Sequence, residues 1–330
     1  MKKSCKVIAA AMAAVMSMSL MACGNADAGA SAGADGNKKY QIGVCQLLEH
    51  PALDAATEGF QAALTELLGA ENVTFDVQNA QGEQATCATI SNNFVAGNYD
   101  LILANATSPL QAAAAATSNI PILGTSVTDF ATALEISDWT GVTGRNISGT
   151  SDLAPIDEQE KMLVELFPEA KTVGILYCSA EPNSKYQAEQ FEKALDADNI
   201  SYKEYTASDS NDIASVVQTA VAEVDVIYIP TDNTMAANTE TINNITLPAG
   251  IPVIAGEEGI CAGCGVATLS ISYYDIGYKA GEMAYEILVK GADIANMAVE
   301  YAPQVTKEYN ADICAQLNIT VPDGYVAIGQ

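Results

Sequence analysis

The stretch VDVIYIPTDNT, residues 224–234, decides the fold. Its first six residues are apolar apart from Asp225, and the next five are small or polar. Such a run is typical of a buried strand whose end leads into a helix. In an open α/β sheet, ligands bind at that junction, outside the carboxyl ends of the strands. Asp232 is therefore the first candidate for a ligand contact, and a helix cap is the alternative role for its carboxylate.

The same alternation of apolar runs and amphipathic segments occurs twice along the chain. We expect strands at residues 41–47, 73–77, 99–104, 121–124, 172–177, 201–205, 226–229, 252–255 and 266–269, and residues 142–147 lie near the end of the first half. We expect helices at residues 52–68, 85–96, 109–117, 157–166, 183–196, 213–222, 235–245, 274–290 and 312–317. Repeated βα units predict parallel sheets covered by helices on both faces. The fold class is therefore α/β, with two doubly wound lobes.

The N-terminus predicts export and a lipid anchor. Residues 1–6 are basic, and residues 7–21 are apolar but too short to span a bilayer. The segment ends in LMACG, residues 20–24, which resembles a bacterial lipoprotein cleavage box. We expect a signal peptide at 1–22, lipid on Cys23 and a flexible tether at 23–39; an ordinary signal peptide with a chance cysteine is the alternative. The mature protein would then be held at the extracytoplasmic face of the cell membrane.

The charge balance excludes one class of partner. The formal net charge is −27, and loss of Lys2, Lys3 and Lys6 with the signal peptide would change it to −30. Nucleic-acid binding requires a basic surface, so we expect no nucleic-acid partner. The sequence contains neither GxGxxG nor GxxxxGKS, which removes the main support for a dinucleotide or a P-loop site. We therefore expect no cofactor.

The cysteines leave one motif open. Cys261 and Cys264 have the spacing of a metal or redox pair. A zinc site needs four ligands, and the sequence offers no second pair with matching spacing and a single histidine, His50. A loop disulfide, two free thiols, and metal binding or catalysis are the alternatives. We expect no metal site.

Polar residues follow the carboxyl ends of the predicted strands in both halves. Two lobes with facing polar rims form a cleft, in which hinge closure buries a small polar ligand. The residues that we expect to contact the ligand are His50, Pro51, Asp54, Asn79, Thr107, Ser108, Thr125, Ser126, Glu181, Asn183, Ser184, Asp232, Asn233, Thr234 and Glu257.

Three of the polar residues have competing interpretations. Ser108 precedes Pro109, so it either caps a helix or helps the helix N-terminus bind a ligand carboxylate, and the two roles are compatible. Arg145, the only arginine, is a candidate for a bidentate carboxylate contact or for a salt bridge between the lobes. His50 would need an acid and a nucleophile for a catalytic triad, and no residue is marked as that nucleophile. We therefore expect a binding protein and not an enzyme, with an exported hydrolase as a weaker alternative.

Six motifs together carry a family resemblance. They are EHPALDA (49–55), QNAQG (78–82), NISG (146–149), EPNS (181–184), PTDNT (230–234) and YYDIG (273–277). In this order and spacing, they resemble the ABC transporter substrate-binding lipoproteins of the tryptophan/tyrosine-binding type. The resemblance covers nearly all of residues 39–322.

The resemblance implies a periplasmic-binding-protein fold in which three crossovers join the lobes. It places the N-terminal lobe at 40–147 plus 273–298 and the C-terminal lobe at 148–272 plus 299–330. It also implies a monomer that delivers tryptophan, tyrosine or phenylalanine to an ABC permease in the membrane. Thr107, Ser108 and Ser126 would hold the ligand carboxylate, Asp232 the amine, and the His50-Pro51 segment the side chain. A sensing module for a membrane receptor, or a binding protein for another small polar solute such as a nucleoside, is the alternative.

Overall fold

The computed structural model describes residues 38–302 and 304–329. The predicted signal peptide, the lipidation site Cys23 and nearly all of the predicted tether lie outside the described residues. Within those two ranges, every helix is too short or too polar to cross a bilayer.

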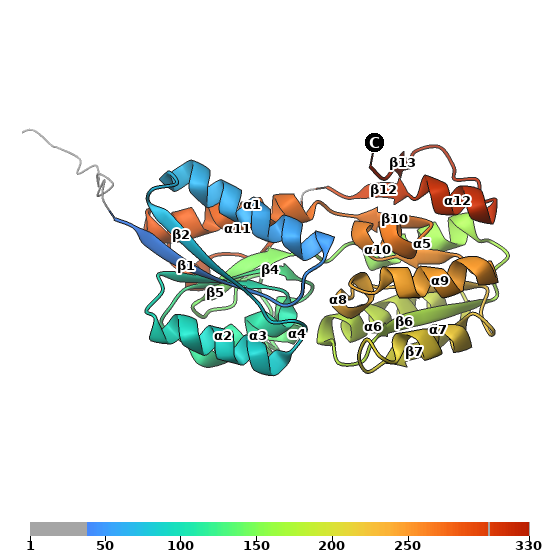
Figure 1. Cartoon of the computed structure of the whole chain (residues 1–330), viewed down its shortest axis with the longest axis horizontal. Helices are drawn as coiled ribbons and strands as arrows, with labels where there is room; N and C mark the ends of the chain where they lie inside the picture. Colours follow the sequence, from blue (N-terminus) through green and yellow to red (C-terminus); the bar gives the residue numbers. More distant parts are fainter. Residues whose placement is uncertain (1–37, 303, 330) are drawn as a thin grey trace, which may run out of the picture. The chain divides into compact units, whose positions relative to one another are not determined.

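The described chain forms two sheets, each covered by helices on both faces (Figure 1). The first sheet has the strand order β11-β5-β4-β3-β1-β2, and all of its pairs are parallel. Its strands are β1 (Tyr40–Gln46), β2 (Val73–Asn79), β3 (Leu101–Asn105), β4 (Ile122–Val127), β5 (Ile147–Ser151) and β11 (Glu300–Tyr301). β3, β4 and β5 are buried along their whole length, as expected for a parallel sheet with two covered faces.

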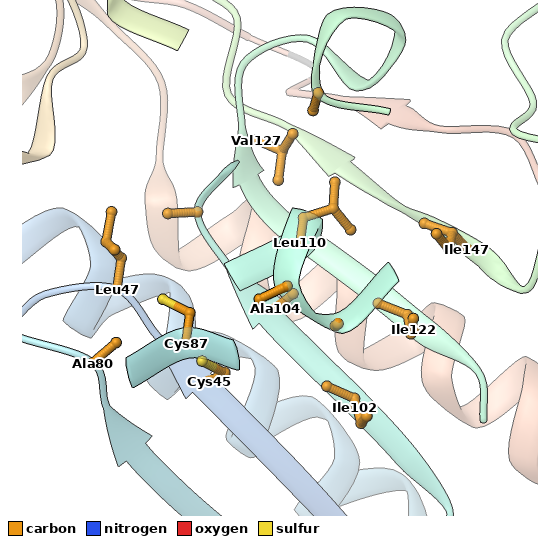
Figure 2. Close-up of a cluster of buried hydrophobic side chains, with 14 of the residues drawn as sticks. Cys45, Leu47, Ala80, Cys87, Ile102, Ala104, Leu110, Ile122, Val127 and Ile147 are labelled. Atoms are coloured by element: carbon orange, nitrogen blue, oxygen red, sulfur yellow. The ribbon is translucent and has the colours of Figure 1, made fainter. Parts of the chain in front are cut away.

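Two helices cover one face of the first sheet and three cover the other (Figure 1). On one face, α1 (Pro51–Leu68) and α11 (Tyr273–Leu288) pack on alternate residues of β1 and β3. On the other face lie α2 (Gln84–Ala96), α3 (Thr107–Ala116) and the short α4 (Phe130–Ala133). Figure 2 shows the core beneath them, where Cys45 and Cys87 lie among aliphatic side chains.

Glycines allow α1 and α11 to pack closely. A Cβ on Gly277 would lie 2.0 Å from the carbonyl oxygen of Ala56, and a Cβ on Gly59 would lie 2.1 Å from that of Tyr274. Both distances are far below van der Waals contact, so only glycine fits at either position. The YYDIG motif therefore has a packing role in addition to any role in binding.

The second sheet has the strand order β13-β12-β10-β9-β8-β6-β7. Its strands are β6 (Thr172–Cys178), β7 (Ser201–Ala207), β8 (Val226–Ile229), β9 (Val253–Ala255), β10 (Ala267–Ser270), β12 (Thr306–Tyr309) and β13 (Val326–Ala327). Only the β10–β12 pair is antiparallel among the described strands. One face packs on α5 (Ile156–Leu166), α6 (Pro182–Ala197) and α12 (Ala311–Leu317). The other packs on α7 (Ile213–Ala220), α8 (Asn233–Ala236), α9 (Thr239–Ala249) and α10 (Glu258–Cys264).

The chain passes between the two sheets three times, after β5, after β10 and after β11. The predicted α/β fold with two lobes and three crossovers is confirmed. The expected lobe limits at residues 147 and 298 differ from the observed sheets, because β5 extends to Ser151 and β11 adds residues 300–301 to the first sheet. A one-turn 3₁₀ helix, Ile294–Asn296, precedes β11.

The strand β5 was not predicted: residues 142–147 were expected only to lie near the end of the first half, and the strand begins at Ile147. Its sequence, ISGTS, resembles a loop because it is small and polar. The hydroxyls are nevertheless satisfied inside the fold: Ser148 donates to the carbonyl of Met297, Thr150 to the hydroxyl of Thr125, and Ser151 to the carbonyl of Thr128. Buried polar groups with partners cost little, so this strand can be buried without apolar residues.

Two helices also differ from expectation. The helix expected at 235–245 is two helices, α8 and α9, separated at residues 237–238. The segment that contains Cys261 and Cys264 is a helix, α10, and both thiols are free and buried in the apolar core. Burial raises the pKa of both thiols well above its usual range, so they are unreactive. The loop disulfide is therefore wrong for this pair.

Candidate functional site

The predicted site residues fall into three groups by exposure. Pro51, Asp54 and Asn79 are exposed, and Asp54 and Asn79 line a surface hollow of about 290 Å³. Ser108 and Thr234 are partly buried. The remaining ten are buried: His50, Thr107, Thr125, Ser126, Glu181, Asn183, Ser184, Asp232, Asn233 and Glu257. Most of the predicted residues are thus shielded from water near the strand ends.

His50 is in contact with the second lobe. It precedes α1, and its Nε2 lies 3.2 Å from Oδ1 of Asn233, which begins α8. The Nδ2 of Asn233 donates to Glu181 at 2.7 Å, so its Oδ1 is the acceptor and Nε2 of His50 carries the proton. Burial lowers the pKa of His50, which keeps the ring neutral at pH 7. Nδ1 is consequently an acceptor, and it is buried with no partner among the described residues.

Glu181 fixes the turn that contains the PTDNT motif. Its Oε1 accepts the backbone N–H and the hydroxyl of Thr234, and its Oε2 accepts the backbone N–H and side-chain amide of Asn233. Asn183 donates to the same Oε2. Glu181 is thus saturated with donors from the loop and from α8, which makes it part of the frame of the site.

Asp232 caps α8, one of the two roles expected from its position. Its Oδ1 accepts the backbone N–H of Met235 at 2.8 Å, and its Oδ2 accepts that of Cys178 at 2.6 Å. Only 1% of its surface is exposed. Burial and, to a smaller extent, the nearby charge of Glu181 raise the pKa of Asp232 to about 8. The two backbone donors partly offset this rise. Contact between Asp232 and a ligand stays a prediction.

A second buried acidic cluster lies at the crossovers between the lobes. Asp152 follows β5, and its Oδ2 accepts the hydroxyl proton of Tyr273 at 3.0 Å, the first residue of α11. Burial raises the pKa of Asp152 to about 6. The hydroxyls of Tyr273 and Thr128 lower the pKa and so partly offset the effect of burial. Glu257 caps α10 by accepting the backbone N–H groups of Gly259 and Ile260, and burial raises its pKa to about 7. Glu257 and Tyr273 also line a hollow of about 430 Å³, together with Pro51.

Sequence reasoning missed Asp152, Thr128, Gln187 and Tyr273. Gln187 of α6 lies 3.5 Å from the hydroxyl of Thr128, a second contact between the lobes. Asp152 was missed because the polar strand before it was not recognised. Tyr273 belongs to the YYDIG motif, in which the sequence indicated no ligand contact. Gln187 lies inside a helix and has no strand-end signal.

The rim of the first lobe contains strained backbone. Ala106 has φ 103° immediately before α3, and Ser126 has φ 54° at the end of β4. Such values are costly for residues other than glycine and are concentrated at functional sites. The hydroxyl of Ser126 is buried and has no partner among the described residues. It lies at the same sheet edge as the N-terminus of α3, where backbone N–H groups favour an anion.

The buried acids have no basic counterpart. None of the described lysines is buried, Arg145 is exposed, and every salt bridge of the described residues is formed by a lysine outside this site. Neither role expected for Arg145 is supported by a contact in this part of the chain. Among residues 38–302 and 304–329, no group of acidic, histidine and cysteine side chains has the geometry of a metal site. The arrangement suits a ligand that has its own positive charge.

Comparisons with known proteins agree with this geometry. The family model described as "ABC transporter substrate binding protein" matches residues 41–328. The "Tyrosine-binding protein" of Clostridioides difficile (strain R20291) is 33% identical over 326 residues, which cover 97% of this chain and 94% of that protein.

Two solved structures are similar over 88% of this chain. An ABC domain from Streptococcus pneumonia in complex with L-Trp is 31% identical, with a TM-score of 0.83 and all of that chain covered. A conserved domain protein from Vibrio cholerae is 30% identical, with a TM-score of 0.84 and 99% of that chain covered.

Proposed function

Because the chain belongs to the ABC transporter substrate binding protein family, we propose that it captures an aromatic amino acid for an ABC importer. In this proposal, lipid on Cys23 anchors the protein at the extracytoplasmic face, and the loaded protein delivers its ligand to a membrane permease. The site lies between the strand ends of the two lobes. Substrate-binding proteins of this family are not enzymes.

One observation carries the proposal for an amino acid. Four buried carboxylates, those of Asp152, Glu181, Asp232 and Glu257, lie at the strand ends or crossovers, and no buried lysine or arginine accompanies them. Buried charges are normally paired, since an uncompensated charge loses its hydration. A ligand ammonium would supply the missing positive charge. The ligand carboxylate would bind at the rim of the first lobe, near the N-terminus of α3 and the free hydroxyl of Ser126.

His50 supports a ligand whose side chain carries a donor. Its Nδ1 is a buried acceptor without a partner in the described chain. The indole N–H of tryptophan and the hydroxyl of tyrosine can donate to it, whereas the phenylalanine ring cannot. We therefore rank tryptophan and tyrosine above phenylalanine. The bound L-Trp of the Streptococcus relative and the name of the Clostridioides relative agree with this order.

Hinge closure would bury the ligand. The lobes already contact each other through His50 and Asn233 and through Thr128 and Gln187. In this proposal, both contacts are made when the lobes close around a ligand. The partner of the His50 ring is an amide instead of a carboxylate, so the hydrolase alternative has no acid to orient its base.

A thermal-shift screen of the purified, lipid-free protein across the twenty amino acids and the nucleosides tests the proposal. At a ligand concentration of 100 times Kd, binding stabilises the folded state by about 2.7 kcal/mol. We expect the largest rise in Tm with L-tryptophan or L-tyrosine. A rise with nucleosides alone would favour the alternative solute, and the absence of a rise with any amino acid would refute the proposal.

A further inference from the structure

Three of the four buried carboxylates are already occupied. Glu181, Asp232 and Glu257 each accept a backbone N–H on both carboxylate oxygens. These bonds hold the first turns of α8 and α10. A carboxylate in this state has a structural role and no oxygen without a donor, although none of these backbone donors carries a positive charge.

Asp152 differs from the other three. Its Oδ2 accepts the hydroxyl of Tyr273, and the nearby hydroxyl of Thr128 also favours its charged form, but its Oδ1 is buried without a hydrogen-bond partner among the described residues. The side chain is only 3% exposed, so this oxygen has lost its hydration without gaining a hydrogen bond from the described residues. Its backbone is fixed, because its N–H donates to the carbonyl of Val127 at 3.3 Å. A fixed, buried acceptor of this kind calls for a donor from outside the described chain.

The position of Asp152 suits one end of an amino acid. Val127 of β4 pairs with Ser151 of β5 in the parallel register, so Ser126 lies one residue before this pair and Asp152 one residue after it, on neighbouring strands. Ser126 has the free hydroxyl, a donor for a carboxylate, and Asp152 has the free oxygen, an acceptor for an ammonium. The two unsatisfied groups are therefore complementary to the two charged groups of one α-amino acid.

The protonation states agree with this assignment. Burial raises the pKa of Asp152 to about 6, so this carboxylate is mostly ionised at pH 7. Burial and the neighbouring Glu181 raise the pKa of Asp232 to about 8, so that group is mostly protonated at pH 7.

From this geometry, and on the basis of the proposed function, we infer that Asp152 is the residue that binds the ligand's ammonium group. Asp232, the residue first expected in this role, holds α8 in place. Since Asp152 lies at the first crossover and its partner Tyr273 at the second, the ammonium would bind directly at the hinge.

The experiment compares ligands with and without the amine by isothermal titration calorimetry. The probes are L-tryptophan and indole-3-propionate, or L-tyrosine and 3-(4-hydroxyphenyl)propionate if the wild type prefers tyrosine. The variants are Asp152→Asn, Asp152→Ser and Asp232→Asn, and the control is Glu300→Gln, an exposed acid on β11. Thermal unfolding establishes which variants fold, and Asp152→Ser serves if the asparagine variant does not.

Because Asp152→Asn removes a hydrogen bond between two charged groups, we expect it to weaken amino-acid binding about 10–100-fold, which corresponds to about 1.4–2.8 kcal/mol. Binding of the propionate should change less than threefold, and Glu300→Gln should match the wild type. If Asp152→Asn weakens binding of the amino acid and of the propionate equally, or weakens neither, the assignment is overturned. It is also overturned if only Asp232→Asn loses the preference for the ligand with the amine. If the wild type binds the propionate but no amino acid, the proposed function fails as well. If the wild type binds amino acids and Asp152→Asn keeps the full preference for the ligand with the amine, only the assignment of Asp152 fails.

Discussion

Asp152→Asn should reduce the pH dependence of stability in the ligand-free protein. Burial raises the pKa of Asp152 from 3.8 to about 6 in the folded chain, whereas in the unfolded chain it returns to its ordinary value. Because the folded-state value is higher, folding takes up a proton between these two pH values. The associated stability is fully present below about pH 4 and is lost as the pH rises through 6.

The size of the effect follows from the same two values. The rise from 3.8 to about 6 corresponds to about 3 kcal/mol, at about 1.4 kcal/mol for each pKa unit. Asp152 is 3% exposed, so solvent screening does not reduce this figure much. For a protein of this size, 1 kcal/mol shifts Tm by about 2 °C. Asp152 alone should therefore lower the Tm of the wild type by about 6 °C between pH 4 and pH 7.

Thermal unfolding of the wild type and of Asp152→Asn, followed by circular dichroism from pH 4 to pH 8, measures this contribution. Asp232 and Glu257 have raised pKa values and His50 has a lowered one, and these groups titrate in both proteins. The difference between the two Tm curves therefore reports Asp152 together with its smaller effect on the pKa of the neighbouring Glu257. Glu300→Gln, the exposed control, should follow the wild type. Parallel curves for the wild type and Asp152→Asn would refute the reasoning.

Two further substitutions test the frame of the site. Gly277→Ala would place a Cβ 2.0 Å from the carbonyl oxygen of Ala56, so α1 and α11 must separate; we expect a loss of about 2–3 kcal/mol in urea unfolding. The exposed Glu282→Ala on the same helix should have little effect, and an unchanged midpoint for Gly277→Ala would contradict the close packing. Asp232→Ala would leave the N–H groups of Cys178 and Met235 without acceptors and should cost about 2–4 kcal/mol. Asp232→Asn, which keeps one acceptor, should lose less, and equal stability of the alanine variant and the wild type would show that the cap contributes nothing.

Much of the fold could be predicted from the sequence, because the strand and helix periods are strong in most segments. β3 and β8 have the apolar runs of buried parallel strands, and both were predicted close to their observed limits. β5 could not be predicted in the same way. Its serines and threonines are buried through hydrogen bonds to residues such as Thr125 and Thr128, and those partners are known only after folding.

The site was predictable only as far as its strand-end residues. The strand-end rule identified His50, Ser126 and Asp232, and all three are buried. It could not separate a ligand contact from a helix cap, since both roles use an acidic or hydroxyl side chain at the start of a helix. The structure separates them by the partners of each oxygen, which sequence periodicity does not encode.

The surplus of buried acid also bears on which solutes the site rejects. Some buried polar groups of a site have a hydrogen-bond partner only when the ligand is bound. Such a site binds poorly to a solute that lacks this partner, because the buried group then remains unpaired. A neutral solute such as a nucleoside could donate a hydroxyl to Oδ1 of Asp152 but would bring no positive charge to the carboxylate. An anion without an amine would in addition lie near the ionised Asp152 without a buried protein cation among the described residues. In the proposed site, an α-amino acid avoids both penalties, because its ammonium pairs with Asp152 while its carboxylate binds beside Ser126 on the neighbouring strand. Selectivity for amino acids thus depends as much on the cost of leaving Asp152 unpaired as on attraction to the ligand.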